Sequence, residues 1–430
     1  MDHERGFRQR LASKISGSCM GAWLLAPELL RLGAWELLRG WTGKADPDVG
    51  PRIALQLIHE TALCAGRIRR KNSLAHQGLA AAGGMGGLVS DEQVHRLLDG
   101  HSMDQARELL VQLGHQRQLC GHYRGQIIAV DPHRIVSASK RIMVKKKKTS
   151  EGPAKKMLQT FFSACAHTGQ PIMATMGSTG VPTTQATKTL LAGTAQIIKG
   201  NALLVADKEH YTDELLSAMD QHERFELLVP AMKTSRLKKL MPTLTYRRLW
   251  AGFAIAEASF CFTDSDTPFR LIAQRTGETS GTYEYSAFAT TSGADATELI
   301  TRNYDRRWSI ENFFNFESEM GLNRASTLNL NIRYGKLALD MMGQAATYGL
   351  RSKLKGPYQT WNAEHLAREV LAWADGDIQV NGDMIIVTFY GACEHLDKNH
   401  YINLPGILEA EGIDPRIPWL YNFKLDFRFK

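Results

Sequence analysis

The spacing of apolar residues along the chain separates a helical first part from a mixed remainder. Over residues 1 to about 75, apolar positions recur at helical intervals, and leucine and tryptophan are concentrated between Trp23 and Trp41. A stretch of small residues that contains Gly83, Gly84, Gly86 and Gly87 predicts a flexible linker.

Two short helices follow the linker, and each has a recognisable start. Ser90 is followed by Gln93, and Ser102 by Gln105, at the spacing of a capping box. The turn between the two helices holds Gly100. The pattern is typical of a helix-turn-helix that contacts DNA, or of a helical hairpin without that role.

From residue 125 the pattern becomes one of short strands mixed with helices. In order, it predicts three strands, a helix, a strand, a helix and a strand: Gln126–Val130, Arg134–Ser139, Pro171–Met176, Thr183–Ile198, Ala202–Ala206, a helix opened by Thr212, and Glu226–Val229. This is the order of an RNase-H-like core, in which the first and fourth strands lie side by side. In that fold Asp131 and Asp207, which follow those two strands, come together.

The segment from about 233 to 292 is β-rich. Its predicted strands are Leu249–Phe262, Phe269–Gln274 and Tyr283–Thr291. They can continue the main sheet, but we interpret them as an insertion before the next helix.

That helix, Arg302–Glu319, contains no Pro or Gly and has helical apolar spacing. Tyr304, Arg307 and Glu311 share one of its faces. An acid beside a guanidinium and a phenol suits the binding of phosphate and metal, whereas ordinary Arg–Glu pairing on an exposed face is the alternative.

We expect the residues after about 355 to form a separate appendage. Asn362 can cap a helix, Asn381-Gly382 is a strong hairpin signal, and the residues from Tyr421 to Phe429 alternate like a half-buried strand. The predicted fold class is therefore α/β: an RNase-H-like catalytic core interrupted by a β-rich insertion, with a helical N-terminal region and a small α+β C-terminal appendage. The expected parts are a helical, DNA-binding region 1–122, core 123–232, insertion 233–293, core helices 294–354 and appendage 355–430.

Composition narrows the class of protein. The chain of 430 residues is 43% hydrophobic and 22% charged, as in folded globular proteins, and its formal net charge is +8. Its six cysteines show no Cys-x-x-Cys spacing, so neither a zinc site nor a disulfide framework is readable. No signal-peptide pattern or apolar membrane span is present, and we expect a cytoplasmic, nucleoid-associated protein without membrane partners.

Two basic stretches are candidate DNA contacts. One contains Arg69 and Arg70, and the other is the run of lysines Lys145, Lys146, Lys147 and Lys148. Such stretches are either solvated surface or segments that follow a phosphate backbone.

Taken together, these motifs resemble the DDE transposases of bacterial insertion sequences. The chain is most similar to the branch with the signature Tyr-x2-Arg-x3-Glu-x6-Lys, which Tyr304, Arg307 and Glu311 match. Asp131 within IIAVDP and Asp207 within LLVADKEHY match the two aspartates, and the resemblance covers roughly residues 120–350. The signature lysine is missing, because residue 318 is Ser, and Arg324 or Lys336 are possible substitutes.

The resemblance implies a chemistry, a cofactor and partners. Asp131, Asp207 and Glu311 are implied to be both the catalytic triad and the ligands of Mg²⁺ or Mn²⁺, with two ions when DNA is bound. Tyr304 and Arg307, together with the two basic stretches, are implied to contact DNA. The implied partners are the terminal inverted repeats of a transposon and a target DNA, with a homodimer as the active assembly.

The chemistry also follows from charge. Two carboxylates about 4 Å apart repel by roughly 4 kcal/mol at an effective dielectric constant of about 20, so a group of three is expected to bind cations. Divalent ions held by carboxylates can activate a nucleophile and neutralise charge at phosphorus. The expected function is metal-dependent cleavage at transposon ends followed by strand transfer. The alternatives are an RNase-H-like nuclease without strand transfer, and an inactive DNA-binding protein derived from a transposase.

Overall fold

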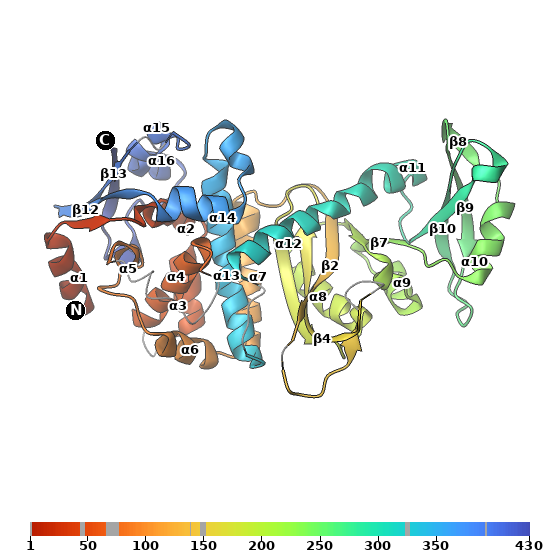
Figure 1. Ribbon diagram of the computed structural model, residues 1–430, viewed down its shortest axis with the longest axis horizontal. Helices are drawn as coiled ribbons and strands as arrows, with labels where there is room; N and C mark the ends of the chain where they lie inside the picture. The colour runs from red at the N-terminus through yellow and green to blue at the C-terminus, as the bar shows by residue number, and fades with distance from the viewer. Residues whose placement is uncertain are drawn as a thin grey trace. The chain divides into compact units, whose positions relative to one another are not determined.

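The computed structural model describes residues 2–43, 48–65, 77–137, 139–146, 152–322, 327–391 and 394–430 (Figure 1). Its internal contacts divide the chain into two compact units. The terminal unit consists of Met1–Cys120 and Asn315–Lys430, and the central unit is Gly121–Phe314.

The central unit is built on one sheet of ten strands, ordered β3-β4-β2-β6-β7-β11-β10-β9-β8, with β5 also paired to β4. The strands are β2 (Ile127–Val136), β3 (Lys145–Lys146), β4 (Lys155–Cys165), β5 (Pro171–Ser178), β6 (Ala202–Ala206), β7 (Phe225–Pro230), β8 (Arg247–Trp250), β9 (Phe253–Phe260), β10 (Phe269–Thr276) and β11 (Glu284–Thr290).

The middle of this sheet is parallel. Strand β6 pairs in parallel with both β2 and β7, and all five of its residues are buried. A short run of continuously apolar residues is what a strand covered on both faces requires. Helix α8 (Thr183–Ile197) contacts β4 and β5, and helix α9 (Asp213–Asp220) contacts β7. The predicted start of α9 is confirmed, since the Thr212 side chain accepts a hydrogen bond from the backbone of Leu215.

The predicted second strand, Arg134–Ser139, is wrong. Strand β2 runs without interruption through Asp131 and Pro132, and its antiparallel partner is β4. Pairing of β2 with β6 ends at Val130, so Pro132 lies where one side of the strand has no neighbour. A proline, which cannot donate a hydrogen bond, is tolerated in such an edge position.

The β-rich segment extends the same sheet. Strand β11 pairs antiparallel with β7, and β10, β9 and β8 follow in turn. The predicted strand Leu249–Phe262 is in fact two strands, β8 and β9. They are separated by a turn at Gly252, whose φ of 72° lies in the left-handed region that favours glycine.

The segment that leads to Glu311 is helical but begins irregularly. A π-helix, η6 (Leu299–Asn303), is followed by a 3₁₀ turn, η7 (Tyr304–Arg307), and then by helix α12 (Trp308–Met320). Turn η7 contacts both β2 and β6. The irregular start therefore lies against the two strands that carry the aspartates.

The terminal unit is mainly helical. Its longer helices are α1 (Asp2–Ala12), α3 (Ala34–Thr42), α4 (Val49–Ala62), α6 (Asp91–Asp99), α7 (Met103–Leu119) and α13 (Leu330–Ser352). Helix α13 is the centre of this unit and packs against α4, α6 and α7. Both predicted capping boxes, at Ser90 and Ser102, are confirmed.

The residues around Gly83 to Gly87, predicted as a flexible linker, form no helix or strand, but they follow a helix and are partly buried. Residues Gln77–Ala82 form helix α5, and the side chains from Leu79 to Ala82 are buried. The Trp419 indole donates a hydrogen bond to the Ala82 carbonyl. A Cβ on Gly84 would lie 2.0 Å from the Trp419 carbonyl oxygen, so this glycine permits close approach of two backbones rather than flexibility.

A second sheet, ordered β1-β12-β13-β14, joins the first and last parts of the chain within the terminal unit. Its strands are β1 (Ile15–Gly17), β12 (Asp375–Asn381), β13 (Met384–Tyr390) and β14 (Lys424–Phe429). The predicted hairpin turn is confirmed, with Gly382 at a φ of 62°. Residues predicted to form a separate appendage thus share one unit with the N-terminal helices.

The remaining short elements of the terminal unit are η1 (Met20–Leu25), α2 (Ala26–Arg31), η8 (Gly356–Thr360), α14 (Ala363–Leu366), η9 (Ala367–Ala372), α15 (Lys398–Ile402), α16 (Leu404–Ala410) and η10 (Pro418–Leu420). Asn362 caps α14 as predicted, accepting a hydrogen bond from the backbone of His365. In the part of the chain that the structure describes, no helix has both the length and the apolar character needed to span a membrane.

Candidate active site

Two neighbouring parallel strands bring Asp131 and Asp207 to the same region of the central sheet. Val130 of β2 is in register with Ala206 of β6, and each aspartate is the next residue along its strand. On its other side, Asp131 is in register with Phe162 of β4. The sheet register therefore positions the two carboxylates as neighbours.

Asp207 is held by the turn that follows β6. Its Oδ1 accepts hydrogen bonds from the Glu209 backbone at 3.0 Å and from Nδ1 of His210 at 2.9 Å. The His210 side chain is fully buried, and its Nε2 has no hydrogen-bond partner among the described residues. Burial acts to raise the pKa of Asp207, but the hydrogen bonds from His210 and the backbone hold this pKa below its usual range.

A second ion pair supports the same turn. The Arg134 guanidinium donates to both carboxylate oxygens of Glu209, through Nη1 at 2.9 Å and through Nη2. Its Nε donates to the side chain of Gln159, which is buried. This forked contact connects β2 to Glu209, in the turn between Asp207 and His210.

Asp131 is the most perturbed acid of this region. Burial, followed by the negative charge of Asp207, raises the pKa of Asp131 to about 7. His210 and Arg307 act to lower this pKa, and Glu311 acts to raise it. Asp131 thus lies within electrostatic range of both other predicted acids, although no hydrogen bond to its carboxylate is found among the described residues.

Tyr304, Arg307 and Glu311 interact along one face of the helical segment. The Arg307 Nη2 donates to Glu311 Oε1 at 2.8 Å, and the Arg307 side chain is also hydrogen-bonded to Tyr304. Tyr304 packs edge-on against Phe288 of β11, with ring centroids 4.8 Å apart. Burial raises the pKa of Tyr304, so the phenol keeps its proton at neutral pH.

The predicted basic stretches are described only in part. Lys145 and Lys146 form β3, which pairs with the start of β4. The other basic residues expected to contact DNA lie outside the described residues, as does Arg324, and they are Arg69, Arg70, Lys147 and Lys148.

Lys336 does not substitute for the missing signature lysine in this structure. Its side chain is buried and paired with Asp340, which is itself fully buried and accepts a hydrogen bond from Thr61. An amine enclosed in this way cannot contact DNA, so the suggested substitution by Lys336 is wrong. Ser318 leaves the signature position without a cation.

A divalent cation such as Mg²⁺ requires several oxygen ligands close together. Among the described residues, no group of three or more His, Cys, Asp or Glu side chains is arranged to hold a metal ion. The two aspartates nevertheless suit a hard cation, because they follow neighbouring strands and Asp131 is an anion destabilised by burial and by the charge of Asp207. Glu311 is instead engaged by Arg307.

Sequence reasoning missed His210 and the Arg134–Glu209 pair. A histidine three positions after a strand-end aspartate was a visible signal within LLVADKEHY, since a turn there places the two side chains side by side. The Arg134–Glu209 contact joins residues 75 positions apart, and no local pattern indicates it.

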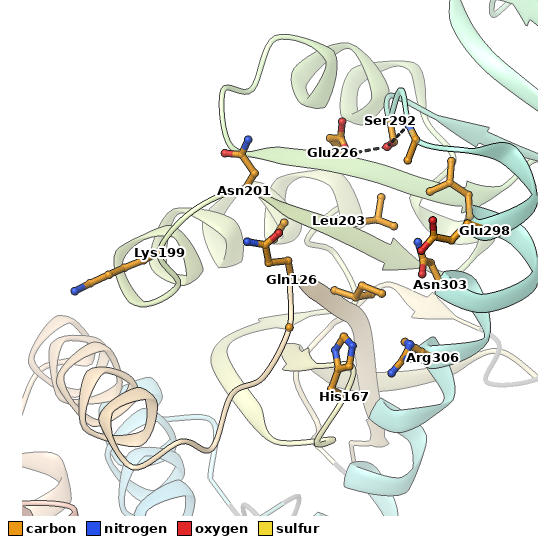
Figure 2. A pocket seen from close by; sticks show the side chains of 15 residues that line it. Gln126, His167, Lys199, Asn201, Leu203, Glu226, Ser292, Glu298, Asn303 and Arg306 are labelled. Carbon is orange, nitrogen blue, oxygen red and sulfur yellow. Dashed lines mark hydrogen bonds between the residues drawn. The ribbon is translucent and has the colours of Figure 1, made fainter.

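A separate cavity of about 770 Å³ lies near the beginnings of β2 and β6, and none of the three predicted acids lines it (Figure 2). His167 and Arg306 lie close together in it, whereas Lys199 points away. Burial and the charge of Arg306 lower the pKa of His167. Glu226, hydrogen-bonded to Ser292, and Glu298 add acids to the lining, so the cavity shows no single charge preference.

Comparison with known protein families gives a match for this chain. The family described as "Transposase DDE domain" matches residues 122–341, which is half of the chain. A search of curated proteins gives no match. Among solved structures, the chain is similar to the piggyBac transposase synaptic complex with hairpin DNA, with 10% sequence identity and a TM-score of 0.44, over 84% of this chain and 83% of that chain.

The matched region begins just before β2 and ends within α13, so it contains both aspartates, the insertion and the helix with Glu311. On this match, the chain belongs to the transposases that carry a DDE domain.

Proposed function

We propose that this transposase cleaves DNA at transposon ends and transfers the cut strands to a target, using Asp131, Asp207 and Glu311. The observation that carries the proposal is the electrostatic coupling of Asp131 to both other acids, together with the parallel pairing of β2 and β6. The strand order β5-β4-β2-β6-β7 supports an RNase-H-like core, in which the first and fourth strands are neighbours.

Asp131 and Asp207 would hold the divalent cation, Mg²⁺ or Mn²⁺, with Glu311 as the third carboxylate. When bound, such ions neutralise charge at phosphorus and lower the pKa of an attacking water or hydroxyl. His210 and the Glu209 backbone fix one oxygen of Asp207, which leaves its other oxygen available. Fixing the carboxylate in advance lowers the entropy lost when a ligand binds.

Arg307 has two roles in the proposal. It orients Glu311 through the 2.8 Å hydrogen bond, and the part of its guanidinium that remains exposed can donate to a phosphate oxygen. Tyr304 also interacts with the Arg307 side chain. A planar guanidinium with several fixed donors is suited to phosphate recognition.

Basic residues would position the DNA. Lys145 and Lys146 contact the phosphate backbone, and the same role is proposed for Arg69, Arg70, Lys147 and Lys148. The partners are the terminal inverted repeats of a bacterial insertion sequence and a target duplex. We further propose that two copies of the chain act together, so that both ends are cut in one complex.

Three conservative variants test the triad. Asp131→Asn, Asp207→Asn and Glu311→Gln are each expected to lower cleavage of a labelled end fragment by at least about a thousandfold, because each removes a charge needed in the transition state. Binding of the fragment, measured by gel shift, is expected to change less than about threefold, since the Lys and Arg contacts are retained. Glu298→Gln is the matched control, because Glu298 lines the separate cavity, and it should cleave normally.

The same assay separates the alternatives. Joined products with a target duplex identify a transposase, and cleavage without joining identifies a nuclease. Binding without metal-dependent nicking would identify an inactive DNA-binding protein, an outcome consistent with the Arg307–Glu311 pairing. Normal cleavage by any of the three variants would remove that residue from the triad.

A further inference from the structure

The segment between β2 and β4 exposes apolar side chains among cations. Ile142 has a relative exposure of 101%, and Val144 of 60%. Single exposed apolar residues are ordinary on protein surfaces. Here, however, they are flanked by Lys140 and Arg141 on one side and by Lys145 on the other, and all three cations are exposed.

The backbone of this segment is held in place. Lys156 Nζ donates to the carbonyl of Ser139 at 3.1 Å and to that of Arg141 at 2.6 Å. The Thr179 hydroxyl donates to the Val144 carbonyl. Ile142 therefore projects into solvent from an anchored backbone.

Its charges call for an anionic partner. Among the described residues, no carboxylate forms an ion pair with Lys140, Arg141 or Lys145, and Lys155 and Lys156 on β4 add positive charge beside them. A protein partner would need a much larger apolar area than one isoleucine and one valine supply. Duplex DNA fits better, because it is a polyanion and because apolar side chains can insert between its stacked bases.

The segment also lies next to the acids. Burial, followed by the positive charge of Arg134, lowers the pKa of Lys146, and Glu209 opposes this effect. Lys146 is therefore close to the Arg134–Glu209 pair, and Glu209 also hydrogen-bonds through its backbone to Asp207. DNA bound at the acids would pass beside this segment.

We propose that Ile142 is a wedge that inserts between stacked bases of the bound DNA, while Lys140, Arg141 and Lys145 bind the flanking phosphates. The proposal rests on the proposed action of this chain on DNA. Apolar side chains that enter a base step unstack it and bend the duplex, and cations beside them compensate the phosphate charge. The wedge would deform DNA close to the cleavage site, without itself contacting the reacting atoms.

The test uses the full chain and a linear duplex of mixed sequence. Permanganate reactivity of thymines reports unstacked steps, and filter binding over a range of salt concentrations reports phosphate contacts. With wild-type protein, we expect several-fold higher reactivity at one or two neighbouring steps. Ile142→Ala should remove that increase while changing the salt dependence of binding little, because the cations remain.

Two controls isolate the effect. Leu119, at the end of α7 in the terminal unit, is 81% exposed, and Leu119→Ala should behave like wild type. The double variant Lys140→Gln/Arg141→Gln should show the opposite pattern, with a lower salt slope but unstacking at saturating protein. Because Ile142 is fully exposed, Ile142→Ala should leave the melting temperature unchanged, which excludes misfolding as a cause.

The proposal fails if Ile142→Ala and wild type give the same permanganate pattern, or if wild type unstacks no step. It also fails if Ile142→Ala alters self-association, which would identify a second copy of the chain as the partner. Asp131→Asn should keep the unstacking because it leaves Ile142 in place. If Ile142→Ala gives the wild-type permanganate pattern while Asp131→Asn loses cleavage, the wedge is rejected and the proposed function stands. If the wild-type protein does not bind DNA, both proposals are rejected.

Discussion

At the scale of single residues, Asp131 makes the stability of the protein depend on pH. Its carboxyl is partly buried beside Asp207, and these two influences raise its pKa to about 7. In the unfolded chain the same group has an ordinary pKa near 4. Between about pH 4 and about pH 7, the Asp131 carboxyl is therefore protonated to a greater extent in the folded protein than in the unfolded chain.

Because of this raised pKa, the contribution of Asp131 to the free energy of unfolding falls as pH rises. The stability contributed by the Asp131 proton is fully present below about pH 4 and is lost as pH rises through about 7. Asp131→Asn removes this loss. In EDTA at pH 8, we expect the variant to be more stable than wild type by roughly 4 kcal/mol, since the pKa rises from near 4 to about 7 and each unit of pKa difference corresponds to about 1.4 kcal/mol. At pH 4 the difference should be small.

Urea unfolding at the two pH values measures this prediction, with Glu298→Gln as the control. Mg²⁺ should stabilise the wild type more at pH 8 than at pH 6, because a cation binds the ionised carboxylate. Equal pH dependence of stability in wild type and Asp131→Asn would contradict the prediction.

His210 provides a second prediction at this scale. His210→Asn is expected to weaken Mn²⁺ binding by about tenfold, because Asp207 loses the hydrogen bond that orients it and holds its pKa low. Calorimetric titration with Mn²⁺ measures the change without reference to catalysis. His167→Asn, in the separate cavity, is the control and should bind Mn²⁺ as wild type does.

The predicted site residues differ in how far the sequence could locate them. The spacing of Tyr304, Arg307 and Glu311 is local, and their interaction along one helical face matches it. The proximity of Asp131 and Asp207 depended on an assumed strand order, because nothing in the intervening residues specifies it. The role of His210 depends on the turn geometry after β6, which spacing alone does not fix.

At the scale of elements, local signals predicted best. Both capping boxes, the cap at Asn362 and the turn at Gly382 are present, because each depends on a few neighbouring residues. Strand β4 was missed, since it begins with lysines and then reads KMLQTFFSAC, buried without polar alternation. Its pairing with β2 is non-local, and Pro132 suggested a break that does not occur.

The capping box of α7 gives a prediction for an element. Ser102 accepts a hydrogen bond from the Gln105 backbone, which would otherwise be unpaired. Ser102→Ala is expected to destabilise the protein by about 1 kcal/mol, whereas Ser102→Asp should retain the cap and most of the stability. Thermal unfolding followed by circular dichroism compares the three proteins. Equal stability of Ser102→Ala and wild type would show that the cap is redundant.

At the scale of the whole molecule, the terminal unit is closed by a contact between distant parts of the sequence. Strand β1 pairs with β12, in register from Ile15 and Ile378 to Gly17 and Gly376. Asp377, which is 4% exposed, accepts a hydrogen bond from Ser16 at 2.5 Å and pairs with Lys14. No sequence pattern could reveal this pairing, because more than three hundred residues separate the two strands.

Removal of residues 2–17 tests the importance of this contact. The deletion exposes the edge of β12, leaves Asp377 without two partners, and removes the buried Phe7 and Leu11. We expect faster hydrogen exchange in β12 and β13, and loss of roughly 3 kcal/mol or more, since Asp377 loses its cation and keeps the hydrogen bond from the Tyr390 hydroxyl. Ser16→Ala, which removes one hydrogen bond, should show a smaller change in the same direction. Unchanged exchange in the deletion would refute this view.

The pairing of β1 with β12 also has a consequence for biosynthesis. While the ribosome is still translating, residues 15–17 have no strand to join until residues 375–381 have left the exit tunnel. The first helices to be synthesised therefore cannot complete the fold of the terminal unit until most of the polypeptide has been made. An mRNA truncated or frameshifted before the β12 codons would therefore yield fragments that lack β12 and cannot complete the terminal unit. We expect proteases to degrade such fragments, so that they do not compete with the intact transposase.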